Sequence, residues 1–383
     1  DGVASFLKAV VRDSGAVGVL VGKGEKPTVE VALAAAGVAL PDGLVWVPIQ
    51  VKADKKLSGL KKVDNGDVYY PSNCSELAYL QYSRVGSGAV RGARVLHRNL
   101  LHQMTGFTHR YGGSGKYVQS TLCCVTPNEP VGMLFGAVLP FALSRTVYLA
   151  PADVEKDPML LLRLLARERV TSAGVTAALM GNLARAVEEE RASIGDLDLL
   201  GLRVLLVGGA CDGAQLLRPG LLRQFLDHVV RTGLRPDVAG SAWVLPETGV
   251  VSAHPHRASK AAVRLLRVSS SALMDGTVEV RGSGFYQPGA PDNVEAREAE
   301  VVVVSTGVPL PFMEVAVVDR SSLLRLDRDR VGELWVCGKS VAAGYWGADE
   351  VGKESFNAHL MGEDTSLARD GWFCTKHVGF VHD

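Results

Sequence analysis

The feature that most constrains the fold is an alternation of short apolar runs with helical patterns over roughly the first 260 residues. Runs rich in β-branched residues predict strands, and apolar residues three or four positions apart predict helices. Strands that alternate with helices favour a mostly parallel sheet with helices packed on its faces. The predicted strands are 16–21, 76–82, 120–126, 146–150, 171–176 and 203–209, and the predicted helices are 3–12, 130–141, 157–169, 177–191 and 215–230.

The pattern changes after about residue 260, where strand-like runs follow one another without a helix of ordinary length between them. Such a series of strands and turns is typical of a β-rich layer or barrel. We therefore predict two parts. Residues 1–260 form layered α/β subdomains that are incomplete at the N-terminal end, and residues 261–383 form a β-rich subdomain.

Charge and composition exclude several classes of protein. The 41 Lys and Arg residues balance 41 Asp and Glu residues, so the chain has no overall attraction for nucleic acid. No apolar run reaches the roughly 18 residues that a transmembrane helix needs. The first residues lack the basic segment and the cleavage site of a signal peptide. No two of the six cysteines have CxxC spacing, which favours a reducing, cytoplasmic setting over a disulfide framework.

One stretch, residues 78–100, combines a predicted strand, a glycine-containing loop and the start of a helix. Small residues in such a loop allow backbone N–H groups to face a phosphate. However, Gly86, Gly88 and Gly92 match neither the GxGxxG nor the Walker spacing. Taken alone, the stretch therefore favours an ordinary strand-to-helix turn.

The same stretch resembles, without gaps, the phosphate-binding motif of adenylate-forming enzymes, LQYTSGSTGxPKGVxxSHxNL. Ser83 and Ser87 stand at the two threonine positions of that motif. By this resemblance Ser83, Ser87, Gly88 and Arg91 contact the phosphates of ATP. The identical residues are Leu80, Gln81, Tyr82, Gly88, Gly92, His97, Asn99 and Leu100.

Two further segments resemble motifs of the same family, in the family's order. The strand end with Gly208 and Gly209 is similar to the segment that packs on adenine. Residues 243–249, WVLPETG, are similar to the family's YGLAET motif. The resemblance implies that Trp243 stacks on the base and that Glu247 holds Mg²⁺.

The C-terminal third extends the resemblance. Residues 331–346 match the family's VGEIWVxGPSVAxGYW almost throughout, and residues 305–319 resemble SCGxPLPGxxVxIVD. Residues 355–383 resemble the fatty-acyl-AMP ligase form, with a long spacer between Phe356 and Trp372 similar to the insertion of that group. The fold implied is α/β: the large N-terminal domain of adenylate-forming enzymes, with the mobile C-terminal domain absent from this chain.

Several replacements depart from the family's motifs. Val85 stands at a loop glycine, although a β-branched side chain resists positive φ. The family's TGD motif corresponds to residues 375–377, TKH, so His377 replaces the Asp that binds both ribose hydroxyls. A carboxylate accepts two hydrogen bonds at once, and a histidine accepts one at most. Residues 128–133, NEPVGM, stand where an HDMG-type motif is expected. These replacements resemble those of the degenerate adenylation-like domains in the disco-interacting protein 2 family.

Two functions follow from the resemblance. The first is a fatty-acyl-AMP ligase-like adenylation domain, which uses ATP and Mg²⁺ to convert a fatty acid into acyl-AMP and pyrophosphate, with catalysis weakened or lost through the replaced motifs. Its candidate nucleotide contacts include His377, and no catalytic residue is assigned. The second is an inactive pseudoenzyme that serves as a protein-interaction, structural or acyl-sensing module in a larger assembly. The expected partners are a fatty-acyl substrate or acyl-AMP and, in the second case, other proteins.

Overall fold

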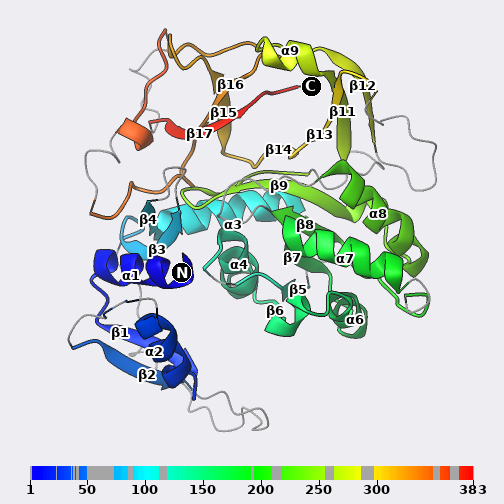
Figure 1. Cartoon of the computed structure of the whole chain (residues 1–383). Coiled ribbons are helices and arrows are strands. Elements are labelled where there is room, and N and C mark those ends of the chain that lie inside the picture. The colour runs from blue at the N-terminus through cyan, green and yellow to red at the C-terminus, as the bar shows by residue number, and fades with distance from the viewer. Residues whose placement is uncertain are drawn as a thin grey trace.

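The structure is a computed structural model of the 383-residue chain. A seven-stranded sheet lies at its centre, between a small N-terminal unit and the C-terminal strands (Figure 1). No helix among the described residues is both long and apolar enough to cross a bilayer. The structure describes residues 2–22, 24–35, 37, 39, 43–49, 73–84, 89–111, 119–126, 128–190, 194–208, 218–254, 263–285, 297–347, 354–362 and 371–382.

The N-terminal unit is a helix followed by a small βαβ element. Strands β1 and β2 are parallel, with Leu20 opposite Val47. The predicted helix 3–12 and the predicted strand 16–21 are both confirmed within two residues. The elements are α1 (Gly2–Ser14), β1 (Gly18–Gly22), α2 (Lys26–Ala35) and β2 (Val45–Ile49).

An antiparallel hairpin leads into the longest helix of this region. Strand β3 (Leu77–Arg84) pairs with β4 (Val90–Leu96), and α3 (His97–Tyr111) follows directly. The sequence predicted β3 and the start of α3, but a direct passage from the loop into the helix is wrong because β4 lies between them. Gly92 explains part of this error, since a glycine argues against a strand. In the structure a Cβ at Gly92 would lie 2.7 Å from the Tyr82 ring.

The central sheet is mostly parallel, as the alternation of strands and helices predicts. The strand order is β14-β10-β9-β8-β7-β5-β6. The five strands from β9 to β6 pair in parallel, and β10 and β14 add antiparallel pairs at one edge. Their bounds are β5 (Ser120–Cys123), β6 (Thr146–Leu149), β7 (Ser172–Thr176), β8 (Val204–Gly208), β9 (Ala239–Leu245), β10 (Gly249–Ala253) and β14 (Val308–Pro309).

Helices cover this sheet with the apolar faces that their periodicity predicts. In α6, Met159, Leu161, Leu162 and Leu165 are all at most 2% exposed, and they join one large core with α7 and α8. Helix α7 begins where the Thr176 hydroxyl accepts a hydrogen bond from the Leu179 N–H. The helical elements are α4 (Pro130–Met133), η2 (Leu134–Val138), α5 (Leu139–Ala142), η3 (Ala152–Glu155), α6 (Met159–Arg167), α7 (Ala177–Glu189), α8 (Pro219–Val229), η4 (Val230–Thr232) and η5 (Pro236–Val238).

The C-terminal part is rich in strands, as predicted, and in Figure 1 it lies above β9. It contains two antiparallel three-stranded sheets, β12-β11-β13 and β15-β16-β17, while β14 joins the central sheet. The division at residues 260 and 261 stays a prediction. The elements are β11 (Arg264–Ser269), α9 (Ser270–Met274), β12 (Val280–Phe285), β13 (Glu300–Val304), β15 (Glu314–Val318), β16 (Gly332–Cys337) and β17 (Phe373–Gly379).

Two residues of this part have left-handed backbone conformations at positions where the resembled motifs have glycine. Phe312, in the PLPG-like segment, has φ +71°, and Lys376, in the TGD-like segment, has φ +62°. L-residues avoid this region because Cβ approaches the following carbonyl oxygen. The two turns therefore keep the left-handed backbone conformation without glycine, the residue that adopts this conformation at the lowest cost.

We expect Lys376→Gly to raise the free energy of unfolding by about 1 kcal/mol, because the left-handed conformation costs a non-glycine residue roughly that amount. The Lys376 side chain is exposed, so few contacts are lost. Urea denaturation measures the change. As a control, Arg281→Gly alters an exposed strand residue outside the left-handed region, and it should lower stability. Changes of the same sign in the free energy of unfolding of the two variants would contradict the prediction.

Candidate functional site

The tight turn between β9 and β10 carries the acidic residue that the sequence singled out. The Thr248 N–H donates to the Leu245 carbonyl at 3.3 Å, with Pro246 and Glu247 in the two middle positions. The β9–β10 register places Gly249 opposite Leu245. Glu247 is only 6% exposed, so its carboxylate faces the protein interior rather than bulk water.

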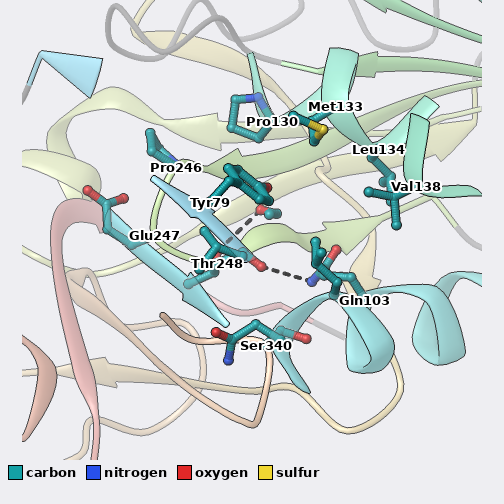
Figure 2. A pocket seen from close by; sticks show the side chains of 14 residues that line it. Tyr79, Gln103, Pro130, Met133, Leu134, Val138, Pro246, Glu247, Thr248 and Ser340 are labelled. Carbon is teal, nitrogen blue, oxygen red and sulfur yellow. Dashed lines mark hydrogen bonds between the residues drawn. The ribbon is translucent and has the colours of Figure 1, made fainter. Parts of the chain in front are cut away.

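Gln103 of α3 fixes the start of β10 through three hydrogen bonds of its side-chain amide. Its Nε2 donates to the carbonyls of Thr248 and Val250, each at 2.9 Å, and its Oε1 accepts from the Val250 N–H at 3.0 Å. Figure 2 shows the side chain directed at Thr248. Gly249 has φ +71°, and a Cβ there would lie 2.9 Å from the Gln103 amide carbon. The turn and the helix are therefore closely fitted to one another.

Asn99, one turn earlier on α3, anchors the segment 339–346 beside this turn. Its Nδ2 donates to the carbonyls of Lys339 and Val341 at 2.7 and 2.8 Å, and its Oδ1 accepts from the Leu96 N–H. The Ala342 N–H donates to the Glu247 carbonyl at 2.8 Å. The matched segment VGELWVCGKSVAAGYW thus ends against the Glu247 turn.

Tyr345 connects the two charged residues that the sequence assigned to the phosphates and the metal. Its hydroxyl donates to Glu247 Oε1 at 2.8 Å, and the Arg91 guanidinium lies 5.4 Å from the centre of its ring. Burial raises the pKa of Glu247, and the Tyr345 hydroxyl partly offsets this. The three side chains form a row in which Tyr345 separates the cation from the carboxylate.

Trp243 and His377 also meet in the structure. The Trp243 Nε1–H donates to His377 Nδ1 at 3.1 Å, and the ring centres are 5.9 Å apart with a tilt of 37°. Burial lowers the pKa of His377. A neutral ring that accepts at Nδ1 carries its proton on Nε2, so the hydrogen bond fixes the tautomer.

This pair predicts a pH-dependent step in stability. Because the pKa of His377 is lower in the folded chain than its ordinary 6.5, the unfolded chain binds the proton more tightly. The contribution to the free energy of unfolding is complete above pH 6.5 and decreases as the pH falls toward the lowered pKa. His377→Gln retains a hydrogen-bond acceptor but cannot titrate. Urea denaturation between pH 7.5 and 5 should show the step in the wild type and not in this variant, and parallel pH profiles would contradict the assignment.

The remaining predicted residues divide into described and undescribed positions. Ser83 is 3% exposed on β3 and lies opposite Arg91 in the hairpin. Gly208 ends β8, where a Cβ would lie 2.7 Å from Val131 Cγ2, so Val131 of α4 covers this glycine. The predicted contacts Ser87, Gly88 and Gly209 lie outside the described residues.

Sequence reasoning missed two residues that organise this region, Gln103 and Tyr345. Tyr345 belongs to the matched GYW segment, so the register of that motif against WVLPETG could have placed it near Glu247. Gln103 carries no sequence signal, because a glutamine inside an amphipathic helix is usually exposed. Among the described residues, no three His, Cys, Asp or Glu side chains gather as a metal cluster.

A small cavity lies between α3, α4 and the Glu247 turn (Figure 2). Its volume is about 30 Å³, which corresponds to about one water molecule. Its lining includes the apolar side chains of Pro130, Met133 and Leu134, the ring of Tyr79, and the polar side chains of Gln103 and Glu247.

The fold matches that of the large N-terminal domain of adenylate-forming enzymes. The chain superposes on a fatty acyl-adenylate ligase from L. pneumophila, solved with acyl adenylate and pyrophosphate, with a TM-score of 0.74 at 19% identity, covering 99% of this chain and 59% of that one. It also superposes on the adenylation domain of a keto acid-selecting NRPS module, with a TM-score of 0.77 at 18% identity, covering 100% and 64%.

Sequence comparison gives the family. Residues 4–346 match the model of the AMP-binding enzyme family, and the chain belongs to that family. It is 30% identical over 317 residues to the medium-chain-fatty-acid–[acyl-carrier-protein] ligase JamA of Moorena producens, covering 81% of this chain and 48% of that protein. It is 25% identical over 309 residues to the long-chain-fatty-acid–AMP ligase FadD26 of Mycobacterium bovis, covering 80% and 49%. The chain thus spans about half the length of these relatives.

Proposed function

We propose that this chain is a fatty-acyl-AMP ligase-like adenylation domain in which acyl-adenylate formation is weak or lost. The inherited reaction joins a fatty carboxylate to the α-phosphate of ATP and releases pyrophosphate. Support for the acyl class comes from the two relatives named as a fatty-acid–AMP ligase and a fatty-acid–carrier-protein ligase. Support for the loss comes from the side chains at the motif positions.

The observation that carries the proposal is the hydrogen bond between Trp243 and His377. These residues stand at the two motif positions that the resemblance gives to the adenine and the ribose. His377 uses its acceptor nitrogen, Nδ1, for the indole N–H. Its other nitrogen then carries a proton and cannot accept a hydrogen bond from a ribose hydroxyl, whereas a carboxylate accepts from both hydroxyls.

The other predicted contacts do not fit ATP and Mg²⁺ either. Glu247 is buried and accepts a hydrogen bond from the Tyr345 hydroxyl, and Arg91 packs on the Tyr345 ring. Val131 lies against Gly208, the glycine that the resemblance gives to adenine, and a Cβ at that glycine would lie 2.7 Å from Val131 Cγ2. For this reason no step of an adenylation mechanism is assigned to these residues.

A second candidate is an inactive module that senses acyl groups or binds proteins. One specific observation favours it. The scaffold around the turn is kept by Gln103 and Asn99, and the backbone of two motif turns is kept despite Phe312 and Lys376 at positive φ. A fold maintained while its nucleotide contacts are replaced fits a role in which shape matters more than catalysis.

Calorimetry with ATP–Mg²⁺ and with a non-hydrolysable dodecanoyl-AMP analogue tests the proposal. We expect the wild type to bind ATP–Mg²⁺ with a Kd weaker than about 1 mM, which corresponds to roughly −4 kcal/mol. Restoring the motif with Lys376→Gly and His377→Asp together should tighten binding at least tenfold, because it returns two hydrogen-bond acceptors.

Three outcomes separate the candidates. Micromolar binding of ATP–Mg²⁺ by the wild type, with pyrophosphate release in the presence of dodecanoate, overturns the loss of activity. Binding of the acyl analogue without binding of ATP–Mg²⁺ supports acyl sensing. The absence of heat with either ligand, from a folded sample, directs attention to protein partners. Lys376→Gly alone is the matched control, since it changes the backbone but restores no acceptor.

A further inference from the structure

The hairpin and the helix that lead to the site lack acidic residues altogether. Residues 77–128 are 52 consecutive positions without Asp or Glu, although these two residue types number 41 in the chain. The same stretch contains six Lys or Arg residues and three His residues. A chain with zero formal net charge therefore carries a local concentration of positive charge, and in the described residues it includes β3, β4 and α3.

Helix α3 presents part of this stretch to solvent. Its exposed residues are Arg98, Leu101, Thr105 and His109, and this spacing places them along one face of the helix. Leu101 is 47% exposed. The opposite face carries Asn99 and Gln103, which are occupied by the Glu247 turn. The exposed face thus combines an apolar side chain, Leu101, with the guanidinium of Arg98 and the imidazole of His109.

Phe312 adds an aromatic ring to this face. The loop before it is held on α3, since Arg110 Nη2 donates to the Pro309 carbonyl at 2.5 Å. The ring lies edge-on to two histidines of α3, with centroid distances of 6.4 Å to His102 and 5.9 Å to His109. Phe312 is nevertheless 59% exposed.

Two features of Phe312 are unfavourable in the isolated chain. Its left-handed backbone, φ +71°, is strained for a bulky residue, and more than half of its surface faces water. A strained residue persists where something else compensates for it, and such positions are over-represented at binding sites. Exposed aromatic residues are also the usual anchors of protein interfaces.

We propose that the exposed face of α3, together with Phe312, is a docking surface for an acidic segment of a partner protein. Carboxylates of the partner pair with Arg98 and with His109, and an apolar side chain packs on Phe312 and Leu101. Charge complementarity identifies the occupant, because α3 itself contributes no carboxylate. The next acidic residue after Phe312 is Glu314, which is paired with Arg325 at 3.0 Å. This inference does not depend on whether the chain forms acyl-adenylates.

The probe for the test is a fluorescein-labelled, 16-residue helical peptide with leucine on one face and glutamate on the other. Fluorescence anisotropy with the whole chain should show saturable binding that weakens as salt rises. Binding should fall at least tenfold in Phe312→Gly, which removes the ring and relieves the strain. It should also fall at least tenfold in the charge reversal Arg98→Glu, His109→Glu.

The chain offers a matched control in Leu323, another apolar residue with positive φ, +56°, that is 38% exposed in a different turn. Leu323→Gly should bind the peptide like the wild type. A peptide with glutamine in place of glutamate should bind at least tenfold more weakly. The proposal is overturned by the absence of saturable binding, by equal binding of the glutamine peptide, or by Phe312-dependent binding to phosphatidylglycerol vesicles without binding to the acidic peptide.

Discussion

Replacing Gly132 with alanine should lower the free energy of unfolding by more than about 4 kcal/mol, a loss of the size seen when a substitution forces backbone segments apart. A Cβ at Gly132 would lie 1.9 Å from the Thr126 carbonyl oxygen and 2.7 Å from that of Val125. These are backbone atoms of the turn that leads into α4, so no side chain can rotate away. The turn itself is closed by the Glu129 N–H, which donates to the same Thr126 carbonyl at 3.0 Å.

Chemical denaturation followed by tryptophan fluorescence measures this loss, with soluble yield as a second readout. Gly220→Ala is the matched control because Gly220 lies in α8 and a Cβ there meets nothing within 4 Å. We expect that variant to be more stable by about 0.5–1 kcal/mol, since alanine favours the helix. If Gly132→Ala were as stable as the wild type, the close approach of α4 to residues 125 and 126 would be wrong.

The same close approach bears on the function. Gly132 allows α4 to lie against the end of β5, and this places its neighbour Val131 over Gly208. The motif at residues 128–133 therefore does more than lose the His and Asp of its resembled counterpart. It supplies the side chain that covers the glycine assigned to adenine.

The sequence predicted the central layers well, because their physical signals are local. Strand β8, VLLVG, is a continuous apolar run, β7 and β8 are both almost fully buried, and α6 has an unbroken apolar face. The parallel order of the sheet follows from their alternation. Strand β4 was not predicted because its sequence, VRGARVL, mixes two arginines and a glycine with apolar residues. Its partners as a strand are β3, where Tyr82 lies opposite Gly92, and Tyr345, which is remote in sequence and forms a bridge with Ala93.

The candidate site was less predictable, because its side chains are chosen by contacts across the fold. The resemblance to known motifs selected Trp243, Glu247 and His377, and the structure places all three in buried or half-buried positions. It could not indicate that Trp243 and His377 form a hydrogen bond with each other. Nor could it indicate that the Tyr345 hydroxyl donates a hydrogen bond to the Glu247 carboxylate. Those pairs join residues 134 and 98 positions apart, and no periodicity carries such information.

Gln103→Leu is expected to cost about 3–5 kcal/mol of stability, because it leaves three buried backbone groups without partners. Each unpaired buried group costs roughly 1–3 kcal/mol, and the three losses are not fully additive. The groups are the carbonyls of Thr248 and Val250 and the Val250 N–H. Leucine is close to glutamine in size, so the loss reports hydrogen bonding rather than a cavity.

The loss of these hydrogen bonds should also affect Glu247, because the turn that Gln103 holds contains Glu247 next to Thr248. Urea denaturation gives the energy, and Gln103→Glu sharpens the test, because a carboxylate of the same shape cannot donate to the two carbonyls. Thr105→Ala on the same helix is the control. Its hydroxyl donates to the Leu101 carbonyl on the exposed face, so its removal should change stability by less than about 0.5 kcal/mol. If Gln103→Leu were no more costly than Thr105→Ala, water or other groups would satisfy the turn, and α3 would not be what holds Glu247 in place.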